Sequence, residues 1–163
     1  MIKKRAETMR TNGTHRQSRE EDRFHEFLRQ YFSDIKRQVT IRGRWTIDFY
    51  INDIDVYVQF DGIYWHGLDR PIEIIRQHAS RQDVIIEQKW KTDQEQVAWF
   101  AENNLTLIRI RSDHFDFKKN ECDSFLEAVV SLLQRRSIDQ LHDVRQFHTD
   151  LTSSNASSGS TAR

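Results

Sequence analysis

The chain has 163 residues, the size of one domain, with 37% hydrophobic residues, 31% charged residues and a formal net charge of zero. A single cysteine, Cys122, excludes an internal disulfide and a cysteine-rich zinc site. No stretch approaches the roughly 18 apolar residues of a membrane span, and no apolar run follows the charged start, as a secretory signal requires. We therefore expect an intracellular protein without a membrane partner and without zinc.

The positive charge is concentrated in residues 1–19, where six basic side chains face the single acidic Glu7. A strip of this kind could lie along a phosphate backbone, and Lys3, Lys4 and Arg5 are its first candidates for DNA contact. The composition fits a solvated leader without fixed structure equally well. Both interpretations stay open at this stage.

The first half of the chain predicts a helix followed by three strands. The helix begins near Ser18, which can cap it, and Glu21 three residues later fits a capping box. Apolar residues follow at helical spacing and should face the core: Phe24, Phe27, Leu28, Tyr31 and Phe32. Strand patterns cover 38–41, 45–51 and 54–60, with turns predicted at Gly43 and at 52–53.

The second half predicts a loop over 61–70, a short helix from Pro71, and a longer helix over 81–103. On the longer helix the predicted buried residues are Val84, Ile85, Trp90, Val97, Ala98 and Ala101. A strand over 105–110 follows, and a helical crossover to it favours parallel pairing. A last helix covers 123–135.

These elements predict one α/β domain of order αβββαβα, with a mixed central sheet flanked by helices. We expect a basic flexible arm over 1–17, the domain over 18–136 and a helical extension over 137–150. A Ser-rich disordered tail should follow over 151–163. The helical stretch 123–150 could pack on its own sheet or form the face of a homodimer.

Two acidic residues stand out because they lie in or next to apolar strands. Asp48 interrupts the run Trp45–Ile51, where a buried carboxylate is costly unless it is paired or binds a metal; a solvent-facing position is the alternative. Asp61 ends the third strand, and neighbouring antiparallel strands would bring it close to Asp48. Such an oxygen-rich site suits Mg²⁺.

The loop after Asp61 adds further functional candidates. It carries Gly62, Tyr64, Trp65 and His66, and a histidine in this place could act as a general acid or base near neutral pH. The alternative for His66 is a loop histidine with only local hydrogen bonds. For Tyr64 and Trp65 the alternative is a role in the core or in anchoring the loop.

The order of these pieces resembles a known family. Ile47-Asp48-Phe49-Tyr50, then Val58-Gln59-Phe60-Asp61-Gly62, Trp65-His66, Asp93 and Leu105–Ile110 are similar to the very-short-patch-repair endonucleases. These form a branch of the PD-(D/E)XK nucleases that also includes phage homing endonucleases of the EDxHD type. The resemblance covers about Glu20 to Arg111 and implies a restriction-endonuclease-like core and metal-dependent DNA cleavage.

The resemblance also implies a role for each matching residue. Asp48 and the backbone carbonyl of Phe60 would bind Mg²⁺, with Mn²⁺ as a substitute, and Glu21 would act through metal-bound water. His66 would handle the attacking water or the scissile phosphate, and Asp93 would orient it. Asp61 falls at a variable position of the family, where it could bind the metal or position His66.

Departures from the family limit what can be carried over. The general PD-(D/E)XK pattern would have glutamate at Gln59 and lysine at Asp61, so the role of the lysine would pass to His66. The structural zinc site of the repair enzymes has no counterpart here. Arg42 and Arg44 at the hairpin, and Tyr64 and Trp65 in the loop, are further candidates for DNA contact.

Several functional alternatives follow from the sequence. The chain could nick one strand, or it could cut both strands as a dimer or with a partner domain. A catalytically inactive nucleic-acid-binding module of the same fold is the main alternative to an enzyme. A plain interaction domain and an RNA substrate are the others.

Overall fold

The computed structural model describes residues 18–138, and the basic arm, most of the helical extension and the tail lie outside them. The chain divides by its contacts into two compact units, and the boundary along the sequence falls between Asp123 and Ser124. The first unit contains the sheet and the candidate site. A last helix runs over residues 123–138. None of the described helices is long and apolar enough to cross a membrane.

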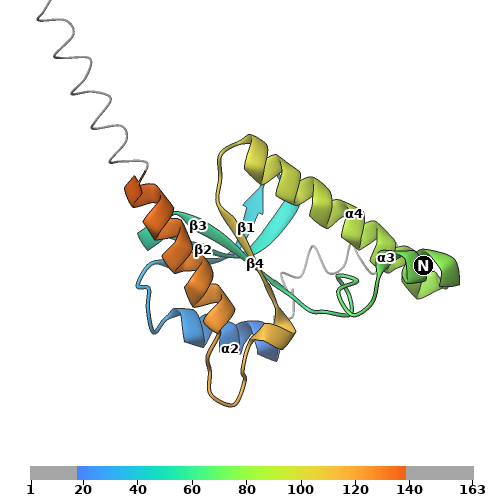
Figure 1. Cartoon of the computed structure of the whole chain (residues 1–163), viewed down its shortest axis with the longest axis horizontal. Coiled ribbons are helices and arrows are strands. Elements are labelled where there is room, and N and C mark those ends of the chain that lie inside the picture. The colour runs from blue at the N-terminus through green and yellow to red at the C-terminus, as the bar shows by residue number, and fades with distance from the viewer. Residues whose placement is uncertain (1–17, 139–163) are drawn as a thin grey trace, which may run out of the picture. The chain divides into compact units, whose positions relative to one another are not determined.

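A four-stranded mixed sheet forms the centre of the first unit (Figure 1). Its strands are β1 (Ile35–Ile41), β2 (Trp45–Ile51), β3 (Val56–Asp61) and β4 (Leu107–Arg111), and their spatial order follows the sequence. The first three strands form an antiparallel meander, with a short 3₁₀ turn, Asn52–Ile54, between β2 and β3. Strand β4 returns parallel to β3, as the helical crossover predicts.

Helix α2 (Arg19–Leu28) covers one face of the sheet. The Ser18 hydroxyl accepts a hydrogen bond from the Glu21 backbone N–H at 3.0 Å, so the predicted N-cap is confirmed. The Phe24 ring stacks on Phe60 at 4.7 Å between centroids and meets Phe115 edge-on at 5.4 Å. Tyr31 lies beyond the end of the helix and is 52% exposed, so its predicted burial is wrong.

Helix α4 (Arg81–Glu102) packs on the opposite face of the sheet, where Phe100 joins Trp45 and Ile47 in one buried cluster. Ser80 caps the helix with Asp83 in a reciprocal capping box. The predicted buried side of α4 is wrong, because Val84, Ile85 and Val97 are exposed. The buried side instead carries Asp83, Ile86, Asp93, Gln96 and Phe100.

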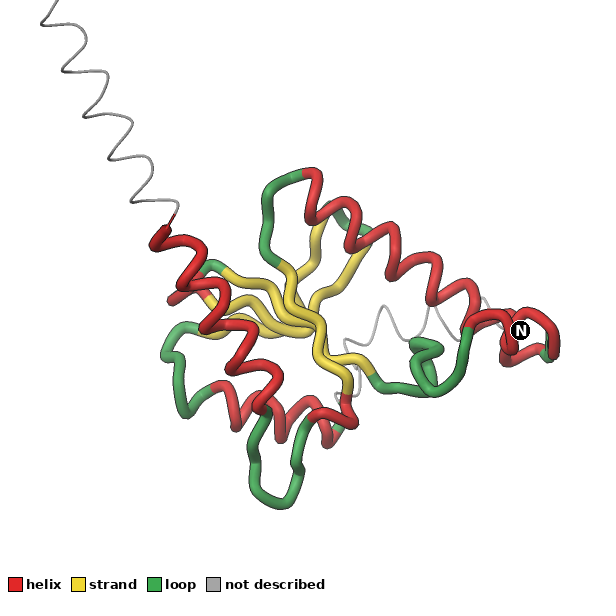
Figure 2. The backbone as a smooth tube through the Cα atoms, in the orientation of Figure 1, coloured by secondary structure: helices red, strands yellow, loops and turns green. Residues whose placement is uncertain are grey.

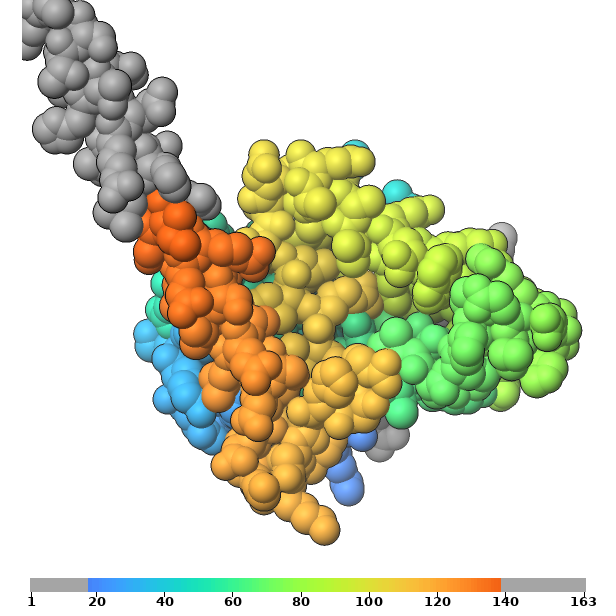
Figure 3. Space-filling view, in the orientation of Figure 1, coloured from blue at the N-terminus to red at the C-terminus, as the bar shows by residue number. Residues whose placement is uncertain are grey.

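The link between β3 and α4 contains most of the irregular backbone near the site (Figure 2). A loop follows Asp61, and the short helix α3 (Ile72–His78) begins after Pro71. Gly67 has φ of +63°, and a Cβ there would lie 3.0 Å from Ile86 and 3.1 Å from Ile75. The Gly67 backbone therefore lies against both Ile75 of α3 and Ile86 of α4. These two helices contact each other, and their atoms adjoin in Figure 3.

Candidate active site

Asp48 lies where the inside–outside alternation of β2 breaks. Ile47 belongs to the cluster on the α4 face, whereas Phe49, two residues later, contacts Phe24 of α2 on the other face. The register of β1 and β2 continues on both sides of this point, but the pair Gln38–Asp48 is missing from it. Gln38 has φ of 52°, an uncommon left-handed conformation for this residue type. Ile47 and Phe49 therefore point to opposite faces of the sheet, with Asp48 at the change between them.

Asp48 is only 7% exposed, so a solvent-facing position is excluded. Its Oδ2 accepts hydrogen bonds from Gln59 Nε2 at 2.7 Å and from the Phe60 backbone N–H at 2.8 Å. Its Oδ1 has only a long contact with Gln38 Nε2 at 3.4 Å. Burial, opposed by the Phe60 N–H and reinforced by the charges of Glu21 and Asp61, raises the pKa of Asp48 to about 6.

The carboxylate of Asp48 opens onto a cavity of about 260 Å³ between α2 and the end of β3. Glu21 reaches this cavity from α2, and His66 and Trp65 reach it from the loop. Its other lining residues are Ser18, Glu20, Gln59, Phe60 and Gly62. Three of the residues predicted to act together therefore share one cavity, although Glu21 is 27 positions from Asp48 and 45 from His66.

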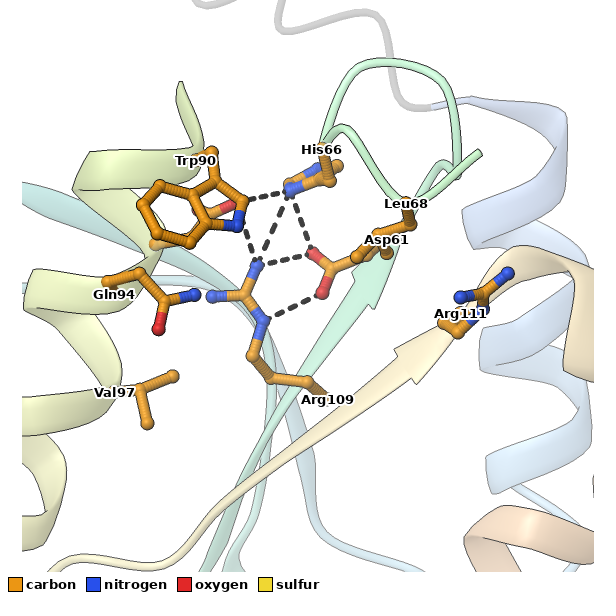
Figure 4. A pocket seen from close by; sticks show the side chains of 9 residues that line it. Asp61, His66, Leu68, Trp90, Gln94, Val97, Arg109 and Arg111 are labelled. Carbon is orange, nitrogen blue, oxygen red and sulfur yellow. Dashed lines mark hydrogen bonds and ion pairs between the residues drawn. The ribbon is translucent and has the colours of Figure 1, made fainter. Parts of the chain in front are cut away.

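His66 is fixed at its Nδ1 edge by two carboxylates (Figure 4). Nδ1 lies 2.6 Å from Asp93 Oδ2 of α4 and 3.2 Å from Asp61 Oδ1 at the end of β3. Because Asp93 is 27 positions away in sequence, the contacts of His66 are not merely local. A second cavity, of about 210 Å³, lies at this side of His66 and is also lined by Trp90 and Arg109.

Both acidic partners of His66 are bound by Arg109 of β4. The guanidinium makes a two-point contact with Asp61, Nε to Oδ2 at 2.7 Å and Nη2 to Oδ1 at 2.8 Å. Nη2 also lies 3.2 Å from Asp93 Oδ2, and Nη1 donates to Gln96 Oε1 at 3.0 Å. These contacts join β3, β4, α4 and the loop in one network.

The charges around Asp93 keep it ionised. Burial alone would raise the pKa of Asp93, but the hydrogen bond with His66 and the charges of Lys89 and Arg109 outweigh burial and lower it. Lys89 Nζ lies 3.1 Å from Asp93 Oδ1, one helical turn before it. Because Asp93 Oδ2 lies 2.6 Å from His66 Nδ1, much closer than Arg109 Nη2 at 3.4 Å, we assign the proton of neutral His66 to Nδ1. Its Nε2, on the opposite edge of the ring, then carries the free lone pair.

The atoms around Asp48 suit a hard divalent cation. The Oε1 of Gln59 is buried without a hydrogen-bond partner, and Asp48 Oδ1 has only its one long contact. The N–H and carbonyl of a strand residue point to the same neighbouring strand, so the Phe60 carbonyl faces β2 as its N–H does. No three His, Cys, Asp or Glu side chains within residues 18–138 form a metal-binding group by themselves. Mg²⁺ uses one or two carboxylates and keeps several waters, so this donor set fits it.

The remaining DNA-contact candidates differ in how they are held. Trp65 is 55% exposed and lines the Asp48 cavity, while the Tyr64 hydroxyl donates to Gln82 at 3.1 Å. Neither is a core residue. Arg44 lies over the Trp45 ring at 4.9 Å and pairs with Glu95, and Arg42 lies over the Trp99 ring at 5.7 Å. Lys3, Lys4 and Arg5 lie outside the described residues.

Several site residues were not among the sequence candidates. Arg109 was noted only as part of the last strand, and Gln96, Lys89 and Gln38 gave no signal of their own. The spacing of residues along α4 could have indicated its buried polar side, because Asp93, Gln96 and Phe100 lie on one side of the helix. A polar pair on that side, opposite a strand with alternating arginines, predicts a buried polar contact.

Comparisons of the chain with protein-family models, with curated proteins and with solved structures each gave no significant match.

Proposed function

We propose that the chain is a magnesium-dependent DNA endonuclease with a restriction-endonuclease-like core. The observation that carries the proposal is the single cavity shared by Asp48, Glu21 and His66, with the Asp93–Asp61–Arg109 network behind the histidine. A buried carboxylate with a raised pKa beside an oriented histidine is typical of hydrolytic sites. The resemblance to the very-short-patch-repair branch of the PD-(D/E)XK nucleases gives the reaction class.

In this proposal the metal-binding residues are Asp48, through its weakly bonded Oδ1, and the Phe60 carbonyl, with Glu21 acting through water. A bound Mg²⁺ would supply charge stabilisation for the phosphate under attack. Gln59 holds Asp48 Oδ2 in place, and its own buried amide oxygen has no hydrogen-bond partner. Mn²⁺ has the same ligand preference and would substitute.

His66 would act through Nε2, because Nδ1 is taken by its acidic partners. The neutral ring can accept a proton from the attacking water, and the protonated ring can donate a hydrogen bond to the phosphate. Asp93 holds the ring by its Nδ1 hydrogen bond. Both oxygens of Asp61 contact Arg109, which favours positioning His66 over metal binding as the role of Asp61.

The route for nucleic acid is proposed from exposed Trp65 at the Asp48 cavity and from the hairpin between β1 and β2. The pairing of β2 with β3 begins at Phe49, and the Arg42–Arg44 hairpin before it lies beside α4, where Arg42 stacks over the Trp99 ring. Arg44 is further held beside α4 by Glu95. Stacked arginines would contact phosphates, and exposed Trp65 would contact a base.

The test is cleavage of supercoiled plasmid by the purified full-length chain, with Mg²⁺ against EDTA. We expect nicked or linear product with Mg²⁺ only, and the product form will separate single-strand from double-strand cutting. Asp48→Ala and His66→Gln should each abolish cleavage. The matched control is His78→Gln, since His78 is an exposed histidine of α3 outside the site, and it should cleave like wild type.

Other outcomes would select other functions. DNA binding without cleavage under any metal would favour the inactive binding module of the same fold. Cleavage of RNA in preference to DNA would change the substrate class while keeping the reaction. Full activity in a folded Asp48→Ala protein would refute the assignment of the site.

A further inference from the structure

We propose that Arg109 is a positioning residue that fixes the orientation and tautomer of His66 by holding Asp61 and Asp93 together at its Nδ1 edge. The kinetic consequence rests on the proposed function, whereas the structural consequence can be measured without it. Arg109 does not line the Asp48 cavity, but its Nη2 lies 3.4 Å from His66 Nδ1, so its effect would pass through the histidine.

The geometry leaves Arg109 little freedom. Its Nε and Nη2 bind both oxygens of Asp61 in parallel, its Nη2 also contacts Asp93 Oδ2, and its Nη1 is held by Gln96. A guanidinium is planar and presents its five N–H donors in a fixed fork. When the guanidinium plane is oriented to bind both Asp61 and Gln96, it also fixes the position at which Asp93 Oδ2 can contact Nη2.

The charges explain why such a clamp is needed. The side chains of Asp61 and Asp93 are 3% and 7% exposed, and both approach the same nitrogen of His66. Two carboxylates that share one site repel each other unless a positive charge lies between them. Arg109 is the one cation within residues 18–138 that contacts both. Lys89 contacts only the other oxygen of Asp93 and is 42% exposed.

Without Arg109 the two carboxylates would separate, and His66 would lose its support on two sides. The imidazole would then populate both tautomers and more than one ring orientation. Lysine cannot restore the arrangement, because an ammonium is a point charge without the fork that reaches Asp61, Asp93 and Gln96 at once. If Arg109 acted only through its positive charge, by contrast, lysine at this position would keep the function.

The first arm of the experiment is kinetic. We expect Arg109→Met and Arg109→Lys to lower kcat about 10- to 100-fold, as loss of an orienting partner does, with KM for DNA changed less than about twofold. The matched control is Arg37→Met in β1, because the 24% exposed Arg37 pairs with Asp22 at 2.7 Å and lines neither of the two cavities at His66. It should keep wild-type kcat.

The second arm is NMR of the protein labelled with ¹⁵N in its histidine rings, with His66→Gln to assign the signals. Wild type should show His66 in the Nδ1–H form, and both Arg109 variants should show mixed tautomers. If Arg109→Met does not fold, Arg109→Lys, which keeps the charge, still decides the question. A wild-type tautomer and kcat in Arg109→Lys would overturn the inference. A shifted tautomer together with a wild type that cuts no DNA would overturn the proposed function and leave the inference standing.

Discussion

Asp48→Asn should make the metal-free protein more stable near pH 8 while removing its activity. Asparagine has nearly the shape of aspartate, and its amide oxygen can still accept from Gln59 and from the Phe60 N–H. What the substitution removes is the negative charge, which is buried beside the charges of Glu21 and Asp61. The same charge is the one that would attract a cation.

The size of the effect follows from the raised pKa. The separation between about 6 in the folded protein and the ordinary 3.8 corresponds, at about 1.4 kcal/mol per pKa unit, to about 3 kcal/mol. A raised carboxyl pKa means that the folded state binds the proton more tightly than the unfolded state. Its contribution to stability is therefore full below about pH 4 and is lost as the pH rises through about 6.

Thermal and urea unfolding at several pH values will measure this. At pH 8 without metal, Asp48→Asn should be more stable by up to about 3 kcal/mol, or roughly 6–12 °C in Tm for a chain of this size. Near pH 3.5 the two proteins should unfold alike. Added Mg²⁺ should stabilise wild type by mass action, by about 2.7 kcal/mol at 100 times Kd, and should leave Asp48→Asn unchanged.

Asp83→Asn is the control of opposite sign. Hydrogen bonds from Ser80 and Arg70 outweigh desolvation and lower the pKa of Asp83, so its contribution is present above the ordinary pKa and is lost as the pH falls through the folded value. Asp83→Asn should therefore destabilise at pH 8. An Asp48→Asn protein that is less stable than wild type at pH 8, or that gains equally at both pH values, would refute the electrostatic reasoning.

Three further predictions concern the surroundings of the site. Gly67→Ala should destabilise by about 1–3 kcal/mol in urea unfolding, because its Cβ would press on Ile86 and Ile75 at an already positive φ; unchanged stability would mean that the loop shifts freely. Ala79→Gly should stabilise by about 1 kcal/mol in the same assay, since the residue after α3 has φ of 45°, and a loss would show that the left-handed turn is not strained. Trp65→Ala should change stability by less than about 0.5 kcal/mol yet weaken DNA binding by about 1–3 kcal/mol in a fluorescence titration; equal affinity would remove Trp65 from the DNA contacts.

The strands could be predicted from sequence because their signals are local. The period of Trp45–Ile51 and the turn at Gly43 gave β2 with its observed bounds, and the helical crossover gave the parallel return of β4. The buried side of α4 could not be predicted by the same reasoning. That side carries charged and amide groups, and a hydrophobic pattern indicates a buried face only where the buried residues are apolar.

The candidate site was predictable where a polar residue interrupts an apolar pattern, as Asp48 and Asp61 do. His66 was a candidate from its place in the loop, Asp93 was found through the resemblance, and the structure brings them within 2.6 Å of each other. Arg109 was missed because an alternating arginine on a strand has the pattern of a solvent-facing residue. Only the folded structure shows that the Arg109 side chain on β4 contacts Asp61 on the neighbouring parallel strand β3.

The distribution of buried polar residues gives the strongest argument that this region is functional. Six polar residues are buried within residues 18–138, and Asp83 is explained by its capping of α4. The other five gather around one histidine and its two cavities: Asp48, Gln59, Asp61, Asp93 and Gln96. A fold gains little from such a cluster, because well-packed apolar residues often serve as well or better than buried ion pairs. The cost falls most clearly on Asp48, because its raised pKa predicts that its charge lowers stability at neutral pH, and this cost is understandable if the charge is kept to bind a cation.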